Sequence, residues 1–114
     1  MIVKTAVSIE KLIDRLYRTE GKAEIINGAP AFAAEVRSEW DYGKRAERKI
    51  AQKVADYLAA GTVAVWDVDV LRQEVIKAYR RDDPNDPVIY RRGEIADAEP
   101  AVPGWRFPVD EMFR

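Results

Sequence analysis

The sequence contains no cysteine and no histidine. The lack of cysteine excludes a disulfide framework and thiol chemistry. The lack of histidine excludes the Ser-His-Asp triad, the usual general base at neutral pH and the commonest zinc ligand. Any bound metal must therefore be a hard cation, namely magnesium, manganese or calcium, held by carboxylate and carbonyl oxygens.

The sequence also lacks a long apolar run and a strong net charge. Met1–Val7 is too short, and too soon interrupted by Lys4, to be a signal peptide or a membrane span, so we expect a cytoplasmic protein without membrane contact. The net charge of −1 gives no general attraction to nucleic acid. Contact with DNA would require a local basic patch.

The chain has 114 residues, of which 47% are apolar and 34% charged. This is ordinary composition for a folded protein, and the length is common for one domain. A chain of this length can bury most of its apolar surface without disulfides or metal. We therefore predict a single domain over residues 1–114.

The first third of the chain predicts a helix and a hairpin. Ser8 is a suitable N-cap for apolar residues at positions 9, 12, 13 and 16, which have helical spacing. Asn27-Gly28 separates the apolar runs Ala23–Ile26 and Ala31–Val36, and this dipeptide is typical of a hairpin turn. Pro30 is then expected at the beginning of a strand, where its missing N–H is tolerated.

A second helix is predicted from Asp41 to about Ala60, ended by Gly61. Val63–Val70 follows after a short turn and is nearly continuous in apolar, β-branched residues. We expect it to be an interior strand parallel to Ala31–Val36. Strand, helix and strand in this order predict a right-handed crossover.

The last third predicts more strands. Glu74–Arg80 and Val88–Arg91 are expected as antiparallel strands separated by a turn-rich loop at Asp82–Pro87. Val109–Phe113 is expected to form a short helical turn. Four side chains of the tail are expected to pack onto the domain, because an exposed aromatic cluster is costly. They are Trp105, Phe107, Met112 and Phe113. The fold class is α/β, or α+β, with a mixed sheet.

Glu35 and Arg37 carry the first candidate chemistry. They end an apolar strand, and the two-residue period of a strand places both side chains on one face. A carboxylate beside a cation is half of a metal-dependent phosphodiesterase site. A Glu-x-Arg sequence on a strand more often marks a solvated sheet edge or a salt bridge than a nuclease site.

Other candidates are each open to a second interpretation. Asp67 and Asp69 form a cation-binding pair or simply face solvent. The basic cluster Lys44–Lys49 contacts phosphates or is an ordinary charged helix exterior. Lys53 lies at the border of the apolar face of its helix. The three tryptophans fit core packing better than stacking on bases.

Several stretches occur in the order typical of one family: Ala23–Gly28, Phe32–Ser38, Lys53–Gly61, Val65–Asp69, Val88–Tyr90 and Pro103–Trp105. Over Ser8 to Phe113 the chain resembles the Uma-two family, whose members are classified as restriction endonucleases within the PD-(D/E)XK nuclease superfamily. The resemblance implies a restriction-endonuclease-like core with one crossover helix.

The resemblance also implies roles for particular residues. Glu35 would be a metal ligand, and Lys53 would be the catalytic lysine, which this family carries on the helix after the Glu strand. Glu24 would be a further metal ligand, with Arg37 and Asp67 as accessory residues. The implied cofactor is Mg²⁺ or Mn²⁺ and the implied partner is DNA.

The chain departs from the family at one place. Between the Asn27-Gly28 turn and the Glu35 strand it lacks the segment that contains the Pro-Asp strand, which supplies a second metal carboxylate. The resemblance therefore implies a truncated fold and a metal-dependent DNA phosphodiester hydrolase, or a remnant of one. The alternative is a catalytically inactive structural or interaction module that keeps the nuclease fold. This alternative includes a chain that was engineered or derived from a fragment. Strands left uncovered by the missing segment would favour a homodimer, with or without exchanged elements.

Overall fold

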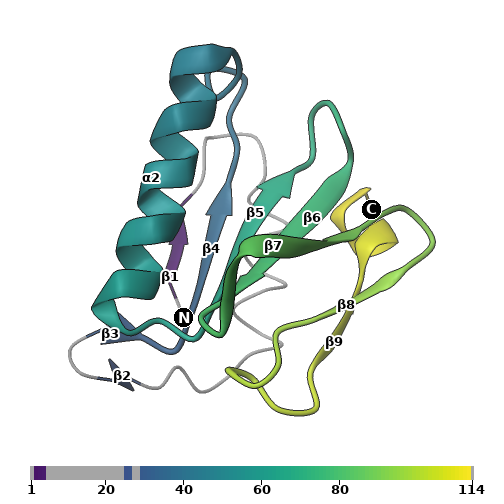
Figure 1. The fold of residues 1–114 in the computed structure, drawn as a ribbon. Coiled ribbons are helices and arrows are strands. Elements are labelled where there is room, and N and C mark those ends of the chain that lie inside the picture. The colour runs from purple at the N-terminus through teal and green to yellow at the C-terminus, as the bar shows by residue number, and fades with distance from the viewer. Residues whose placement is uncertain (1, 5–24, 27–28, 114) are drawn as a thin grey trace.

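The computed structural model describes residues 2–4, 25–26 and 29–113 (Figure 1). The helix expected after Ser8 lies outside these described residues. The largest sheet has five strands in the order β1-β4-β5-β6-β7. These strands are β1 (Ile2–Lys4), β4 (Phe32–Val36), β5 (Ala64–Asp69), β6 (Val75–Arg80) and β7 (Asp83–Tyr90).

The sheet is mixed, as predicted. β1, β4 and β5 are parallel, whereas β6 and β7 are antiparallel to their neighbours. Helix α2 (Lys44–Ala60) joins β4 to β5 and forms the predicted crossover. Its length and polarity do not allow it, or any other described helix, to span a membrane.

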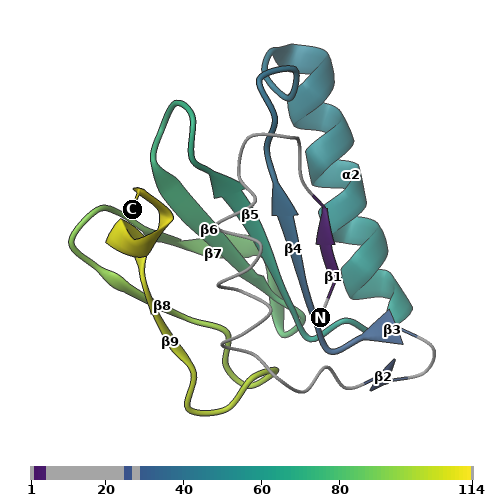
Figure 2. The same ribbon diagram turned by 180° about the vertical axis from the view of Figure 1, so that it is seen from behind.

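Helix α2 covers one face of the sheet (Figure 2). Its buried residues Ile50, Val54 and Leu58 recur every four positions and pack with Val65 of β5. Gly61 ends the helix in a left-handed conformation, with φ of 115°, and donates its N–H to the carbonyl of Leu58. The predicted helix and its C-terminal glycine are confirmed.

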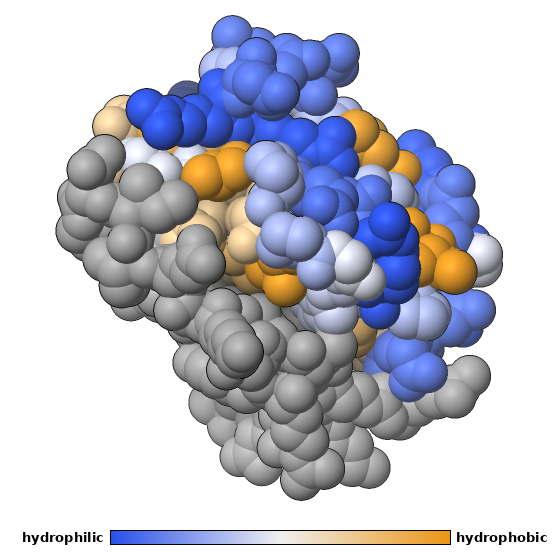
Figure 3. Space-filling view, turned by 90° about the horizontal axis from the view of Figure 1, so that it is seen from below, coloured by the Kyte–Doolittle hydropathy of each residue, from blue (hydrophilic) through white to orange (hydrophobic). Residues whose placement is uncertain are grey.

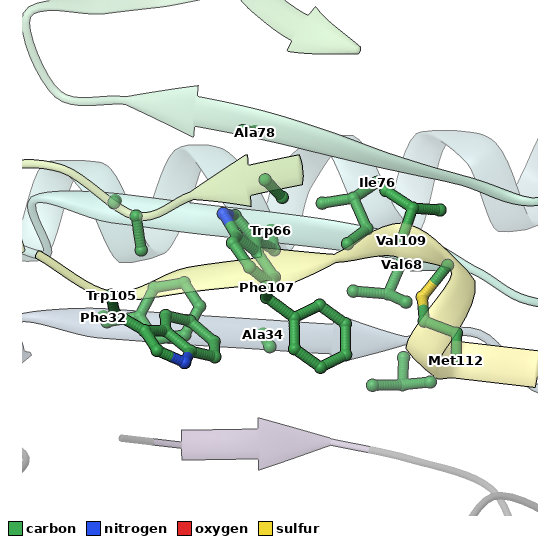
Figure 4. Packing of buried hydrophobic residues seen from close by; sticks show 14 residues of the cluster. Phe32, Ala34, Trp66, Val68, Ile76, Ala78, Trp105, Phe107, Val109 and Met112 are labelled. Atoms are coloured by element: carbon green, nitrogen blue, oxygen red, sulfur yellow. The ribbon is translucent and has the colours of Figure 1, made fainter. Parts of the chain in front are cut away.

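The tail covers the opposite face of the sheet. It consists of β8 (Ile95–Asp97), β9 (Arg106–Pro108) and the 3₁₀ helix η1 (Val109–Phe113). Trp105 stacks on the fully buried Trp66 of β5, with ring centroids 5.1 Å apart (Figure 4). The predicted packing of the tail aromatics and the predicted final helical turn are both confirmed.

The predicted hairpin pairing was wrong. The strands that pair antiparallel on either side of Asn27-Gly28 are β2 (Ile25–Ile26) and β3 (Ala29–Pro30), each two residues long, and β4 is not one of them. Pro30 therefore ends a strand instead of beginning one. β4 pairs with parallel neighbours on both sides. Such a strand is apolar on both faces, which explains why its sequence does not alternate.

The predicted loop at residues 82–87 was also wrong. β7 begins at Asp83 and passes through Pro84 and Pro87, and its register with β6 shifts between Ala78 and Arg80. β7 is the last strand of the sheet, so its two prolines interrupt no hydrogen bonds to a further neighbour in the described sheet.

Candidate active site

The candidate site lies at the carboxyl ends of β4 and β5, beside α2. Both strands point toward the end of the molecule at which α2 starts (Figure 1). Glu35 and Asp67 are register partners, two residues beyond the pair Ala33 and Val65, and Val65 packs against α2. Side chains two apart share a face, so both carboxylates are on the helix side of the sheet. The carboxyl ends of parallel strands are the usual ligand-binding edge of α/β sheets.

The structure brings Glu35 and Lys53 together. Lys53 Nζ is 3.8 Å from Glu35 Oε2. Glu35 is 7% exposed, whereas the Lys53 side chain is 56% exposed and reaches over the carboxylate from α2. Tyr57, one turn after Lys53, donates its hydroxyl to Glu35 Oε1 at 3.4 Å. Burial, together with the charge of Glu35, raises the pKa of Tyr57.

Arg37 is buried and is the centre of an ionic network with the buried Asp67 and the half-exposed Glu47. Its Nε and Nη2 donate to the two oxygens of Asp67, each at 2.9 Å. Nη1 and Nη2 also donate to the two oxygens of Glu47, and Nη1 donates to the carbonyl of Asp41. The hydrogen bonds to Asp67 and Glu47 raise the pKa of Arg37, and the bond from Arg37 lowers the pKa of Glu47.

This network gives Arg37 a structural task. Its guanidinium is buried between β5 and the first turn of α2, so it joins the helix to the sheet. Of the two interpretations of the Glu35–Arg37 pattern, a nuclease site or a salt bridge, the salt bridge is therefore the one that applies to Arg37. Asp67 has both oxygens engaged by the same side chain, which offsets its charge.

Asp69 is also buried and engaged. It accepts hydrogen bonds from the Tyr42 hydroxyl at 2.5 Å and from the backbone N–H of Arg72 at 3.0 Å. The Arg72 guanidinium lies 4.3 Å from the centre of the Tyr42 ring. Burial and Asp69 raise the pKa of Tyr42. The expectation that Asp67 and Asp69 face solvent was wrong, because this face of β5 is covered.

Sequence reasoning did not identify Tyr42, Glu47 or Tyr57 as site residues. A signal existed for Tyr57, which is four positions after Lys53 and therefore on the same side of α2. Glu47 is in the first turn of α2 but ten positions from Arg37, and its spacing gave no sign of that contact.

The described residues do not by themselves complete a site for Mg²⁺ or Mn²⁺. Among them, no group of three or more carboxylates is arranged so that it could hold a metal ion. Asp67 is committed to Arg37, and Glu35 contacts Lys53 and Tyr57. Glu24, the other predicted ligand, lies outside the described residues. Hard divalent cations need several oxygen ligands.

The exposed side of α2 is basic near its start. Its exposed cations make no ion pair with any residue in the described part of the chain; they are Lys44, Arg45, Arg48 and Lys49. Trp40, in the loop before the helix, is 83% exposed. The prediction that all three tryptophans belong to the core was therefore wrong for Trp40.

Comparison with known proteins identifies the family. No curated protein matches the chain. A family model, Uma2, described as "Putative restriction endonuclease", matches residues 5–110. The match includes β4, α2 and β5, which carry Glu35, Lys53 and Asp67, and it covers nearly all of the chain. The α+β architecture agrees with a restriction-endonuclease-like core. The chain therefore belongs to the Uma2 family of restriction-endonuclease-like proteins.

Proposed function

We propose that this protein hydrolyses phosphodiester bonds in DNA at a centre built on Glu35 and Lys53. The observation that supports the proposal is the approach of Lys53 Nζ to within 3.8 Å of the buried Glu35 carboxylate. This contact is at the carboxyl ends of the parallel strands β4 and β5, where ligands usually bind in α/β sheets. Family membership points to the same class of reaction.

The two side chains have complementary tasks in phosphodiester hydrolysis. The Glu35 carboxylate, which by resemblance is also a ligand of the divalent cation, accepts a proton from the attacking water. The Lys53 ammonium group attracts the phosphate and stabilises the negative charge that develops on its oxygens. A divalent cation, when bound, supplies further charge neutralisation in nucleases. Its remaining protein ligands would have to come from outside the described residues, and Glu24 is the candidate by resemblance.

The basic side of α2 supports DNA as the substrate. Lys44, Arg45 and Arg48 are exposed in the first part of α2, nine, eight and five residues before Lys53. Each Lys or Arg that neutralises a phosphate releases counterions, so affinity falls as salt rises. The local cations supply the attraction that the net charge of −1 does not.

Cleavage of a labelled DNA with Mg²⁺, with Mn²⁺ and with EDTA tests the proposal. We expect Lys53→Met and Glu35→Gln each to reduce the rate roughly 10²-fold or more, since each removes a group that acts on the reacting phosphate or water. Arg91→Met is the control, because Arg91 is an exposed cation outside α2 and its basic side. Wild-type cleavage that persists in both variants would contradict the assignment.

A second candidate function is a catalytically inactive binding module. The observation that favours it is the pairing of Asp67 with Arg37, because it occupies a carboxylate beside Glu35. Calorimetric titration with Mg²⁺ and Mn²⁺ distinguishes the two. Absence of binding at millimolar metal, with no cleavage by a folded protein, supports the module. Binding that Glu35→Gln abolishes supports the hydrolase.

A further inference from the structure

Trp40 differs sharply from the other two tryptophans. Trp66 and Trp105 are buried in the core, whereas Trp40 is 83% exposed. Burying a tryptophan contributes a large hydrophobic stabilisation, which Trp40 does not provide in this structure. Exposed aromatic side chains are typical of surfaces that bind another molecule.

The loop that carries Trp40 is ordered by hydrogen bonds. The Trp40 N–H donates to Ser38 Oγ at 3.2 Å, and the Ser38 N–H donates to Asp41 Oδ2 at 2.7 Å. The Asp41 N–H returns to the Ser38 carbonyl at 3.0 Å, and the Asp41 carbonyl accepts from Arg37. Trp40 is thus held on a tight turn that the buried Arg37 network anchors, which limits the entropy it loses on contact.

The surroundings of Trp40 favour an anionic ligand with an aromatic part. Four residues after Trp40 the exposed basic side of α2 begins, with Lys44, Arg45 and Arg48. Five residues before it is Glu35, so the two Cα atoms are at most about 18 Å apart. A nucleotide beside the candidate site combines the two features needed, a phosphate for the cations and a base for the indole ring.

We propose that Trp40 stacks on an unpaired base and positions single-stranded or unwound DNA across the site. Bases in an intact duplex are already stacked on their neighbours, so only an unpaired base can present its face to the indole. The inference rests on the proposed function for its location. It adds the prediction that unpaired DNA is the preferred substrate.

Fluorescence anisotropy tests the inference without cleavage. A labelled single-stranded oligonucleotide and the duplex of the same sequence are titrated in EDTA. Wild-type protein binds the single strand more tightly, and Trp40→Ala weakens that binding roughly 10-fold, as loss of one stacked base would. Trp40→Phe retains most of the affinity. Leu71→Ala is the control, since Leu71 is also exposed and apolar and leaves the affinity unchanged.

Two results would overturn the inference. One is unchanged single-strand affinity in Trp40→Ala. The other is an equal loss for single strand and duplex, which would mean that the ring supports the loop and contacts no base. If Trp40→Ala instead lowers the mass of an oligomer and spares DNA binding, Trp40 belongs to a contact between copies. Cleavage by the wild type is measured separately, so failure of the hydrolase proposal is distinguishable.

Discussion

Arg37 illustrates how the position of a residue can be predicted when its task cannot. The strand period correctly places it on the same face as Glu35, where a nuclease would use a cation. The partners that define its task are Glu47 and Asp67, ten and thirty residues away in the chain. Those contacts follow from the packing of α2 on the sheet, which residue spacing does not encode.

Replacement of Arg37 tests its structural task. Arg37→Met leaves Asp67 buried without its cation, and we expect a loss of about 3–5 kcal/mol in the free energy of unfolding. The measurement is urea denaturation at neutral pH. Arg45→Met, on the exposed side of α2, should change stability by no more than about 0.5 kcal/mol. A loss in Arg37→Met as small as in that control would show that the network contributes little.

Local patterns predicted the positions of Glu35 and Lys53, whereas the choice of Lys53 as a site residue came from the family resemblance. The strand period aims Glu35 at the helix, and the helical period puts Lys53 at the margin of the packed face. Their contact at 3.8 Å follows once the crossover is formed. The catalytic and metal-binding roles of Glu35, Lys53 and Glu24 stay predictions.

At the scale of elements, the longest patterns were the most informative. α2 combined a helical apolar period with a terminal glycine, and β5 was a nearly continuous apolar run, so both were predicted close to their observed bounds. β7 was missed over residues 83–87 because Pro84 and Pro87 usually mark loops. They are tolerated at the free edge of the sheet, and edge position is a property of the sheet order.

The central position of β5 leads to a stability prediction. Trp66 is fully buried and contacts the rings of Phe32, Trp105 and Phe107. Trp66→Ala removes a fully buried indole from this cluster, and we expect a loss of about 3–5 kcal/mol because of the cavity left behind. Chemical denaturation measures it. A loss below about 1 kcal/mol would contradict the central place of this strand.

At the scale of the whole molecule, the edges of the sheet bear on the predicted homodimer. One edge is β1, which pairs with β4 and is three residues long against five for β4. The other edge is β7, where Val88 and Ile89 are exposed. On the face seen in Figure 3, the hydrophobic residues drawn in colour form small separate groups among hydrophilic ones. An open strand edge is therefore the stronger reason for self-association.

We accordingly keep the prediction of a homodimer, formed by edge pairing or by exchange of elements. Light scattering at micromolar concentration should give about twice the chain mass of 13.0 kDa. Val88→Lys, which places a charge on the β7 edge, should shift the population toward monomer. A wild-type mass near 13.0 kDa across this concentration range would refute the prediction.

The central claim is that Glu35 and Lys53 act as one hydrolytic unit. A double-mutant cycle on the DNA cleavage rate tests this claim most directly, with wild type, Glu35→Gln, Lys53→Met and the double variant under identical metal and salt. Residues that act as a unit are strongly non-additive, so the double variant should be about as slow as either single variant. Two additive losses, or rates equal to wild type throughout, would contradict the account.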